Sequence, residues 1–304
     1  MKRVAVVGAD EIGASWTAWF LSQGLDVDVW DPNPDFESYV GNYVARAWPA
    51  LERLGLRPGA APDRWSPHQD RLEAVSRAQF VQESLTETPE IAREFYAAVE
   101  PAMLPEAILA SSAGMMRMTD LQGGLSTPGR FVIGHPFNPP HLIPLVEVVP
   151  GDRTTAETVD FCMAFYRAIG KHPIHVRKEV PGHLGNRLQA ALYREAVNLV
   201  AEGVASVEDV DRAITHGPGL RWSIIGPHLA YHLAGGMSFM RVNESWWPTL
   251  GQPQLTPELC ERLLAGVRAE TDGQDMASLT GQRNDLLVTL LQTIGSRRPG
   301  ERQT

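Results

Sequence analysis

Hydrophobic and polar positions change period repeatedly along the first half of the chain. Residues 4–7 form a β-branched run that predicts a buried strand, and residues 15–23 have a helical pattern that Gly24 closes. Further apolar runs predict strands over residues 26–30, 80–84, 107–111, 131–133, 145–149 and 173–176, and the pattern at 89–100 predicts a helix. Strands separated by helices predict an α/β fold with a doubly wound, mostly parallel Rossmann-type sheet.

Beyond residue 179 the pattern indicates helices alone. Leu188, Leu192 and Leu199 recur at helical spacing within a long predicted helix over residues 184–202. Further helices are predicted over residues 207–216, 227–233, 257–271 and 276–294, with a turn at 217–222. We therefore expect a dinucleotide-binding domain over residues 1–180 and an all-helical domain for substrate and dimer contacts over residues 181–304.

Composition narrows the class of protein. A chain of 304 residues, 43% hydrophobic and 21% charged, is long enough for about two globular domains. Its formal net charge of -9 disfavours nucleic acid and anionic membranes as partners. No apolar run is long enough to predict a membrane-spanning helix. Cys162 and Cys260 are too few for a disulfide framework or a zinc site, which favours a cytoplasmic location.

The first strand, turn, helix and second strand follow the order of a dinucleotide-binding βαβ unit. Glycines at the two ends of the turn permit tight packing, and the helix N-terminus faces a diphosphate. The acidic residue that ends the second strand suits a ribose with free hydroxyls, so NAD is favoured over NADP. The expected cofactor contacts are Gly8, Asp10, Glu11, Ile12, Gly13 and Asp31. The alternative is an ordinary βαβ unit that binds no nucleotide.

A histidine and a glutamate carry the candidate chemistry. His135 lies in the stretch Gly-His-Pro-Phe-Asn-Pro-Pro, and Glu147 follows twelve residues later in an apolar run. An imidazole with an oriented carboxylate partner can take a proton from a hydroxyl near neutral pH. The alternative is a turn in which His135 only packs. Glu83, Ser111 and Ser112 follow predicted strands in the same sheet, where ligands of such folds bind.

Asn186 opens the long predicted helix, in the stretch Pro-Gly-His-Leu-Gly-Asn-Arg-Leu. Its amide can donate to a substrate oxygen or hydrogen-bond the imidazole. The alternative role is capping of the helix, which asparagine does well.

These blocks together resemble the 3-hydroxyacyl-CoA dehydrogenase family over residues 2–235. The most similar branch contains λ-crystallin, L-gulonate 3-dehydrogenase and carnitine dehydrogenase. The resemblance implies a Rossmann domain, a helical domain that forms a homodimer, and NAD-dependent interconversion of a 3-hydroxy and a 3-keto group. It implies that His135 is the general base, that Glu147 orients it and that Asn186 positions the substrate oxygen. It also implies cofactor contacts near Glu83 and Glu87.

Three positions depart from the family pattern. Asp10 replaces the middle glycine of the turn, Gly114 stands where the family has a serine that bonds the reacting oxygen, and Ala92 replaces a lysine. A donor to that oxygen is commonly worth a few kcal/mol, so we expect Ser112 to substitute for the serine. The departures leave two alternatives open. One is a redox-inactive isomerase, dehydratase or cyclase that uses the same pair, and the other is a non-catalytic binding protein.

The substrate is open among an acyl-CoA, a carrier-bound acyl group, a small hydroxy acid and a carnitine-like cation. Arginines within residues 46–71 suit a phosphorylated adenosine, although exposed charges on a solvated surface are more common. The aromatic residues Trp222, Phe239, Trp246 and Trp247 suit a cation through cation–π attraction, although such groups usually form a core or a dimer interface.

Overall fold

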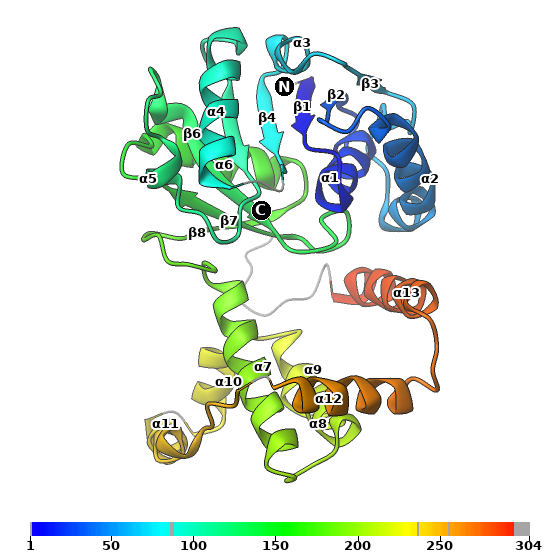
Figure 1. Ribbon diagram of the computed structural model, residues 1–304, viewed down its shortest axis with the longest axis vertical. Coiled ribbons are helices and arrows are strands. Elements are labelled where there is room, and N and C mark those ends of the chain that lie inside the picture. The colour runs from blue at the N-terminus through cyan, green and yellow to red at the C-terminus, as the bar shows by residue number, and fades with distance from the viewer. Residues whose placement is uncertain (1, 86–87, 236, 255, 295–304) are drawn as a thin grey trace. The chain divides into compact units, whose positions relative to one another are not determined.

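The computed structural model describes residues 2–85, 88–235, 237–254 and 256–294 and divides into two compact units (Figure 1). The first unit, Met1–Arg187, holds every strand among the described residues. The second unit, Leu188–Thr304, is helical throughout its described part. The α/β fold and the helical C-terminal region are thus confirmed.

An eight-stranded sheet forms the centre of the first unit. Its strands are β1 (Arg3–Val7), β2 (Asp26–Trp30), β3 (Trp65–Pro67), β4 (Phe80–Glu83), β5 (Ile108–Ser111), β6 (Phe131–Pro136), β7 (Leu145–Pro150) and β8 (His172–His175). The order β3-β2-β1-β4-β5-β6-β7-β8 begins with the strand order of dinucleotide-binding folds. All neighbours pair in parallel except β6 and β7, which are antiparallel.

Helices cover both faces of this sheet because successive strand residues point to opposite sides. Val4 and Val6 pack with the helices α1 (Glu11–Ser22), α2 (Phe36–Leu54) and α6 (Ala156–Ala168). Ala5 and Val7 pack on the other face, with α3 (Arg71–Ser76), α4 (Pro89–Val99) and α5 (Met118–Leu121). The pattern of the sequence predicts neither α2 nor β3, and the structure adds both to the first unit.

The described part of the second unit is built from helices and short connections. The helices are the greater part of α7 (Gly185–Ala201), then α8 (Val207–Thr215), α9 (Pro218–Trp222), α10 (Pro227–Leu233), α11 (Met237–Glu244), a 3-10 helix at Trp247–Thr249, α12 (Pro257–Glu270) and α13 (Met276–Ile294). Arg262 on α12 donates to the carbonyl oxygens of Val200 and Ala201, which fixes α12 at the end of α7. The expectation of a turn at 217–222 is wrong, because Pro218 opens the short helix α9 there.

None of the helices in the described part of the chain combines the length and the apolar character needed to cross a membrane.

Candidate active site

The antiparallel pair β6–β7 brings the predicted histidine and glutamate together. His135 and Glu147 are register partners across the two strands, so their side chains project from the same face. His135 Nδ1 lies 2.8 Å from Glu147 Oε2, and the Glu147 side chain is fully buried. The pair is thus set by strand register and does not depend on a flexible loop.

The start of α7 holds the other oxygen of this carboxylate. The backbone amides of Leu184 and Gly185 donate to Glu147 Oε1 at 2.8 and 3.0 Å. Burial alone raises the pKa of Glu147, but the hydrogen bonds from His135 and the two amides outweigh it, and the pKa lies below its usual value. An ionised Glu147 accepts a hydrogen bond from His135 Nδ1–H, which leaves Nε2 as the basic nitrogen.

Gly114 marks the place where a substrate oxygen can meet this base. A Cβ atom built on Gly114 would lie 2.9 Å from His135 Nε2 and 3.3 Å from Asn186 Nδ2. The two nitrogens therefore face one spot beside Gly114, one as a base and the other as a donor. A point within reach of both is the geometry that proton abstraction from a hydroxyl requires.

Ser112 belongs to a buried hydrogen-bond chain beneath this spot. Gln82 Nε2 donates to Ser112 Oγ at 2.9 Å and to the carbonyl oxygen of Gly134 at 3.2 Å. Tyr166 donates to Gln82 Oε1 at 2.7 Å, and the hydroxyls of Ser112 and Ser84 are 2.9 Å apart. Since one serine donates to the other, one hydroxyl hydrogen of this couple is left for a further acceptor. Whether Ser112 takes the role of the missing serine stays a prediction.

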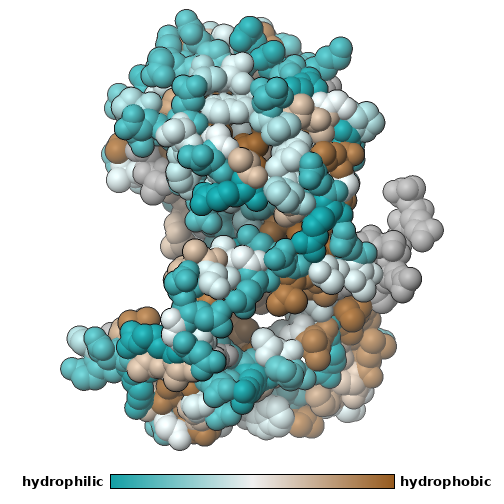
Figure 2. All heavy atoms as spheres, turned by 90° about the vertical axis from the view of Figure 1, so that its right-hand side faces the viewer, coloured by the Kyte–Doolittle hydropathy of each residue, from teal (hydrophilic) through white to brown (hydrophobic). Residues whose placement is uncertain are grey.

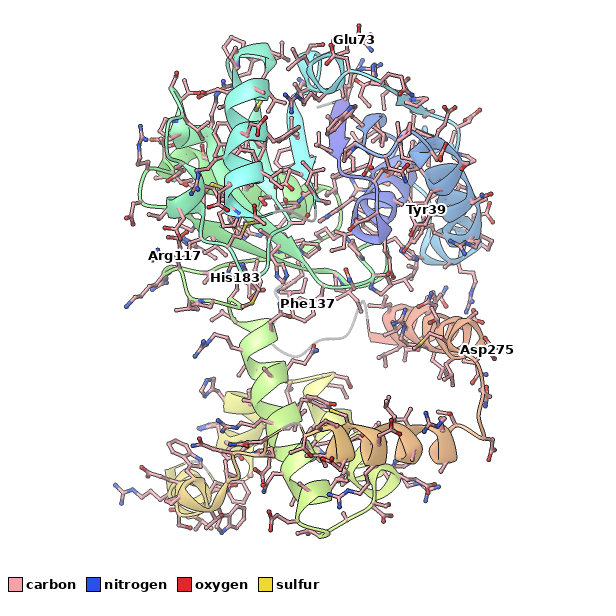
Figure 3. All side chains as sticks on the ribbon, viewed as in Figure 1. Tyr39, Glu73, Arg117, Phe137, His183 and Asp275 are labelled. Carbon is pink, nitrogen blue, oxygen red and sulfur yellow. The ribbon has the colours of Figure 1, made fainter. Side chains whose placement is uncertain are left out.

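His183 is a site residue that sequence reasoning missed (Figure 3). Its ring is 2% exposed and lies 5.2 Å from the His135 ring, centroid to centroid. Its Nε2 lies 3.0 Å from the carbonyl oxygen of Ala113, whereas its buried Nδ1 has no hydrogen-bond partner among the described residues. Burial lowers the pKa of His183, although the hydrogen bond to Ala113 opposes this shift. An unpaired buried nitrogen lowers the free energy of unfolding by about 1–3 kcal/mol, which other interactions of the fold must offset.

Phe137, labelled in Figure 3, packs against the His135 imidazole. Its ring centroid is 5.7 Å from that of His135, edge to face. A Cβ atom built on Gly185 would lie 2.3 Å from the Phe137 ring, so the aromatic ring packs directly on the start of α7. The imidazole is thereby confined between aromatic side chains and the helix.

The predicted cofactor end of the unit centres on the start of α1. Asp10 is the N-cap of this helix, and its Oδ1 accepts from the amides of Ile12 and Gly13 at 3.0 and 3.2 Å. Amides at a helix N-terminus are the groups that bind a diphosphate in such folds. Asp10 thus occupies donors that a dinucleotide would use, and Glu11 follows as the first exposed residue of the helix.

Asp31 closes β2 beside the glycine turn, as the sequence predicts. Its Oδ2 accepts from the Ala9 amide at 2.5 Å and its Oδ1 from the Asn33 amide at 2.7 Å. Each carboxylate oxygen retains a further lone pair for a ribose hydroxyl. A Cβ atom on Gly13 would lie 1.7 Å from the Gly8 carbonyl oxygen, so the turn is as tight as a dinucleotide fold requires. These residues fit NAD once the Asp10 side chain turns away from the helix.

Glu83 lies at the end of β4 with its side chain buried. Its Oε1 accepts from the Leu85 amide at 2.6 Å, and its Oε2 accepts from the Tyr96 hydroxyl at 2.7 Å. Burial and the charge of Glu83 raise the pKa of Tyr96. Ala92, at the position where the resemblance implies a lysine, is buried in the apolar cluster on the same face of the sheet. Glu87 lies outside the described residues.

Two family models cover most of the chain. The NAD-binding domain of 3-hydroxyacyl-CoA dehydrogenase matches residues 3–180, and the C-terminal domain of the same enzyme matches residues 182–274. The chain belongs to the 3-hydroxyacyl-CoA dehydrogenase family. Asp10, Ala92 and Gly114, the three positions noted in the sequence analysis, lie within the matched NAD-binding domain.

Curated relatives extend the match to nearly the full length. The chain is 44% identical to an L-carnitine dehydrogenase of Streptomyces coelicolor over 99% of this chain and 97% of the relative. It is 41% identical to an L-carnitine dehydrogenase of Pseudomonas aeruginosa over 97% of this chain and 94% of the relative.

Solved structures show the same architecture. An FHMPC 5-dehydrogenase, described as an NAD+ dependent dismutase, matches with a TM-score of 0.85 and 27% identity, covering 98% of this chain and 99% of that one. A 3-hydroxybutyryl-CoA dehydrogenase of Escherichia coli matches with a TM-score of 0.68 and 26% identity, covering 87% of this chain and 57% of that one. Family, relatives and fold identify the chain as an NAD-dependent oxidoreductase that acts on a 3-hydroxy substrate.

Proposed function

We propose that this oxidoreductase acts on a small 3-hydroxy acid with a quaternary ammonium group, and that L-carnitine is its substrate. The proposal rests on the 40–44% identity to L-carnitine dehydrogenases along almost the whole chain. The net charge of -9 supports a cationic substrate over a coenzyme A ester, which carries several phosphate charges. The exposed indoles of Trp222, Trp246 and Trp247 in the second unit offer faces for such a cation.

The pair His135 and Glu147, on the neighbouring strands β6 and β7, supports the proton-transfer step. His135 Nε2 takes the proton of the substrate hydroxyl, and the buried Glu147 carboxylate stabilises the imidazolium that results. Asn186 Nδ2 donates to the same oxygen while the carbon–oxygen double bond forms. The residues at the start of α1 would hold NAD, which would supply the hydride acceptor for carbon 3 of the substrate. Residues 1–180 then hold the cofactor, and residues 181–304 contribute substrate and dimer contacts.

Steady-state kinetics test the substrate. NADH formation is measured with L-carnitine, L-gulonate and 3-hydroxybutyryl-CoA, each at several concentrations with saturating NAD. We expect kcat/KM for L-carnitine to exceed the other two by at least about tenfold, the discrimination that one well-placed recognition group gives. A preference for the coenzyme A ester or for L-gulonate would contradict the proposed substrate.

The role of His135 has its own experiment. His135→Ala is expected to lower kcat by about 10²–10⁴-fold, the usual contribution of a general base, while the Kd for NADH changes less than about twofold. His175→Ala is the matched control, because His175 is an exposed histidine on β8 of the same sheet. Wild-type protein that shows no saturable NADH binding would favour the redox-inactive isomerase, dehydratase or cyclase.

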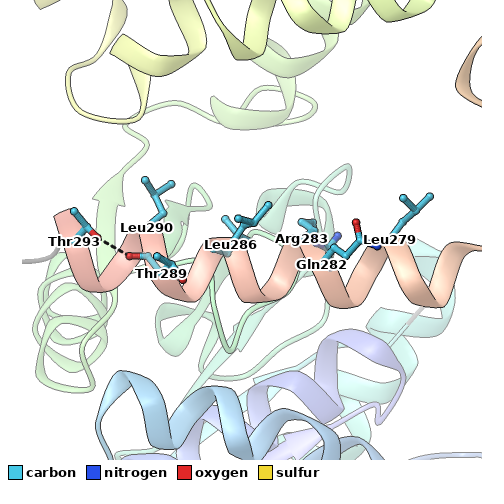
Figure 4. Close-up of a pocket in the computed structure, with 8 residues that line it drawn as sticks. Leu279, Gln282, Arg283, Leu286, Thr289, Leu290 and Thr293 are labelled. Atoms are coloured by element: carbon cyan, nitrogen blue, oxygen red, sulfur yellow. Dashed lines mark hydrogen bonds between the residues drawn. The ribbon is translucent and has the colours of Figure 1, made fainter. Parts of the chain in front are cut away.

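A homodimer through the second unit is also part of the proposal. Hydrophobic side chains lie exposed over this unit in Figure 2, although single exposed residues are common in any protein. They include Leu188, Leu220, Leu233, Trp247, Leu264 and Leu286, each more than half exposed. Leu279, Leu286 and Leu290 project from one side of α13 and line an apolar groove on that helix (Figure 4). A second copy of the chain is the occupant that we expect.

Light scattering of the purified protein tests the dimer. We expect a mass of two chains for the wild type and of one chain for Leu286→Glu, because a buried carboxylate at this face is strongly unfavourable. Glu208→Gln on the exposed surface of α8 is a control that leaves the mass unchanged. We also propose a cytoplasmic location, since NAD is supplied there and Cys162 and Cys260 are free thiols.

A further inference from the structure

Four consecutive residues before and at the start of α7 bind two separate parts of the catalytic site. The Gly182 amide donates to the Gly114 carbonyl oxygen at 3.1 Å, and His183 Nε2 lies 3.0 Å from the Ala113 carbonyl oxygen. The next two amides, of Leu184 and Gly185, donate to Glu147. Residues 182–185 therefore hold the Ala113–Gly114 loop and the carboxylate that orients His135.

His183 differs from the other three because it binds with its side chain. A backbone amide comes with nearly any residue, whereas this contact needs a ring nitrogen that carries hydrogen. A carbonyl oxygen only accepts, so Nε2 carries the proton and Nδ1 carries a lone pair. A ring that merely filled the space between Ala113 and His135 would need no nitrogen at all.

Two unfavourable features coincide at His183. Its φ of 48° lies in the left-handed region, which residues with a side chain adopt rarely, and its buried Nδ1 meets no hydrogen-bond partner in the part of the chain that the structure describes. Strained residues of this kind gather at functional sites, where the surrounding structure holds them in place. His183 lies 5.2 Å from His135, centroid to centroid, so the strain is located beside the base.

We propose that His183 is a positioning residue of the dehydrogenase reaction, which holds the Ala113 carbonyl through a neutral Nε2–H tautomer and so keeps Gly114 beside His135 Nε2. This proposal rests on the role proposed above for His135. In the proposed reaction the substrate oxygen lies beside Gly114. The distance between Gly114 and His135 Nε2 therefore sets the path of the proton. Displacement of reacting groups by about 1 Å can cost about 10²-fold in rate.

The two neighbouring imidazoles then have opposite tautomers. His135 carries its hydrogen on Nδ1, toward Glu147, and His183 carries its hydrogen on Nε2, toward Ala113. When His135 takes the substrate proton, its positive charge opposes protonation of His183. His183 therefore stays neutral while it donates to Ala113, in agreement with the lowering of its pKa by burial.

A pair of variants distinguishes the effect of the hydrogen-bond donor from the effect of side-chain volume at position 183. His183→Gln keeps an N–H donor at a similar reach, and His183→Met has a similar length without a donor. With NAD and L-carnitine we expect kcat of the methionine variant to fall by about 10- to 100-fold, with the KM for NAD unchanged, and the glutamine variant to stay within about fivefold of wild type. Wild-type kcat in the methionine variant, or an equal loss in both variants, would overturn the proposal.

Nitrogen-15 NMR of the histidine rings in the wild-type protein gives a second test that needs neither substrate nor a folded variant. We expect the His183 signals, assigned through the backbone, to show a neutral ring protonated at Nε2 at pH 7, and the His135 ring to be protonated at Nδ1. A His183 ring that is protonated at Nδ1, or charged, would overturn the proposal. A wild-type protein without activity on L-carnitine would contradict the proposed function. The NMR measurement would still decide the proposal for His183.

Discussion

Gly114 faces His135 so closely that a Cβ atom on the glycine would lie 2.9 Å from the imidazole Nε2. The imidazole has little freedom to move away, since its other nitrogen is held by Glu147 at 2.8 Å. The resemblance described in the sequence analysis implies a serine at this position. In this chain the loop and the imidazole have closed over the space that such a side chain needs.

The first prediction concerns restoration of that serine. Gly114→Ser is expected to lower kcat by about tenfold or more, because the new Cβ displaces His135 or Asn186 from the reacting oxygen. The measurement is steady-state NADH formation. Gly123→Ser is the matched control, since a Cβ there would meet its nearest atom at 3.9 Å. An increase in kcat for Gly114→Ser would show that the serine is simply missing and that the loop can accept it.

The second prediction concerns the carboxylate at the start of α1. Asp10→Ser keeps a side-chain cap for the Ile12 and Gly13 amides and removes the negative charge that opposes the diphosphate. We expect the Kd for NADH, measured by fluorescence titration, to fall by about 5- to 10-fold at low salt, with a smaller difference at high salt.

A capping aspartate elsewhere gives the control for this experiment. Asp70 accepts from the Leu72 amide at the start of α3, so Asp70→Ser makes the same chemical change on another helix. Equal affinities of wild type and Asp10→Ser would mean that the Asp10 carboxylate already lies clear of the diphosphate when NADH binds.

The third prediction uses the lowered pKa of Glu147. The unfolded chain has the ordinary carboxyl value of 4.5 and the folded chain a lower one, so the stabilisation is complete above pH 4.5 and is lost as the pH falls through the folded value. Glu147→Gln should lower the free energy of unfolding by about 1–3 kcal/mol at pH 7. The difference from wild type should shrink below pH 4.5.

Urea unfolding at a series of pH values measures this difference. The exposed Glu52 supplies the control variant Glu52→Gln, for which we expect no such pH-dependent loss. A difference between wild type and Glu147→Gln that persists unchanged well below pH 4.5 would show that charge on Glu147 is not what stabilises the fold.

The fourth prediction concerns the buried Lys171. Its ammonium nitrogen donates to the carbonyl oxygens of Pro140 and Ile143 and lies 3.9 Å from the Trp19 ring centroid. It therefore holds the loop between β6 and β7. Lys171→Met removes both hydrogen bonds and should lower the free energy of unfolding by about 1–3 kcal/mol.

A chemical denaturation curve of Lys171→Met tests this expectation. Lys178→Met, at an exposed lysine nearby in sequence, should stay within about 0.5 kcal/mol of wild type. Burial lowers the pKa of Lys171 because desolvation disfavours its charged form. A variant as stable as wild type would mean that apolar packing replaces the two hydrogen bonds without loss.

Elements with strong apolar periodicity could be predicted from sequence, and weaker ones could not. The strand at 26–30 and the helices at 227–233 and 276–294 have the predicted bounds. Strand β3 has only three residues at the sheet edge and ends in a proline, so its pattern is too short to detect. Helix α2 contains Pro49 and exposes a polar face, which hides its apolar stripe.

The residues of the candidate site also differ in how far the sequence predicts them. His135 and Glu147 are recognisable because their motif is local, and strand register then brings them together. Asp10 could have been recognised as a helix cap from its residue type alone. His183 could not, because its role depends on a left-handed backbone and on Ala113, which lies 70 residues earlier in the chain.

The antiparallel pairing of β6 with β7 also matters for protein engineering. His135 and Glu147 lie on one contiguous hairpin, so any segment that keeps this hairpin also keeps the geometry of the pair. The couple and its supporting amides all lie within Met1–Arg187, so a chimaera that continues α7 from Arg187 with residues of another enzyme would retain them.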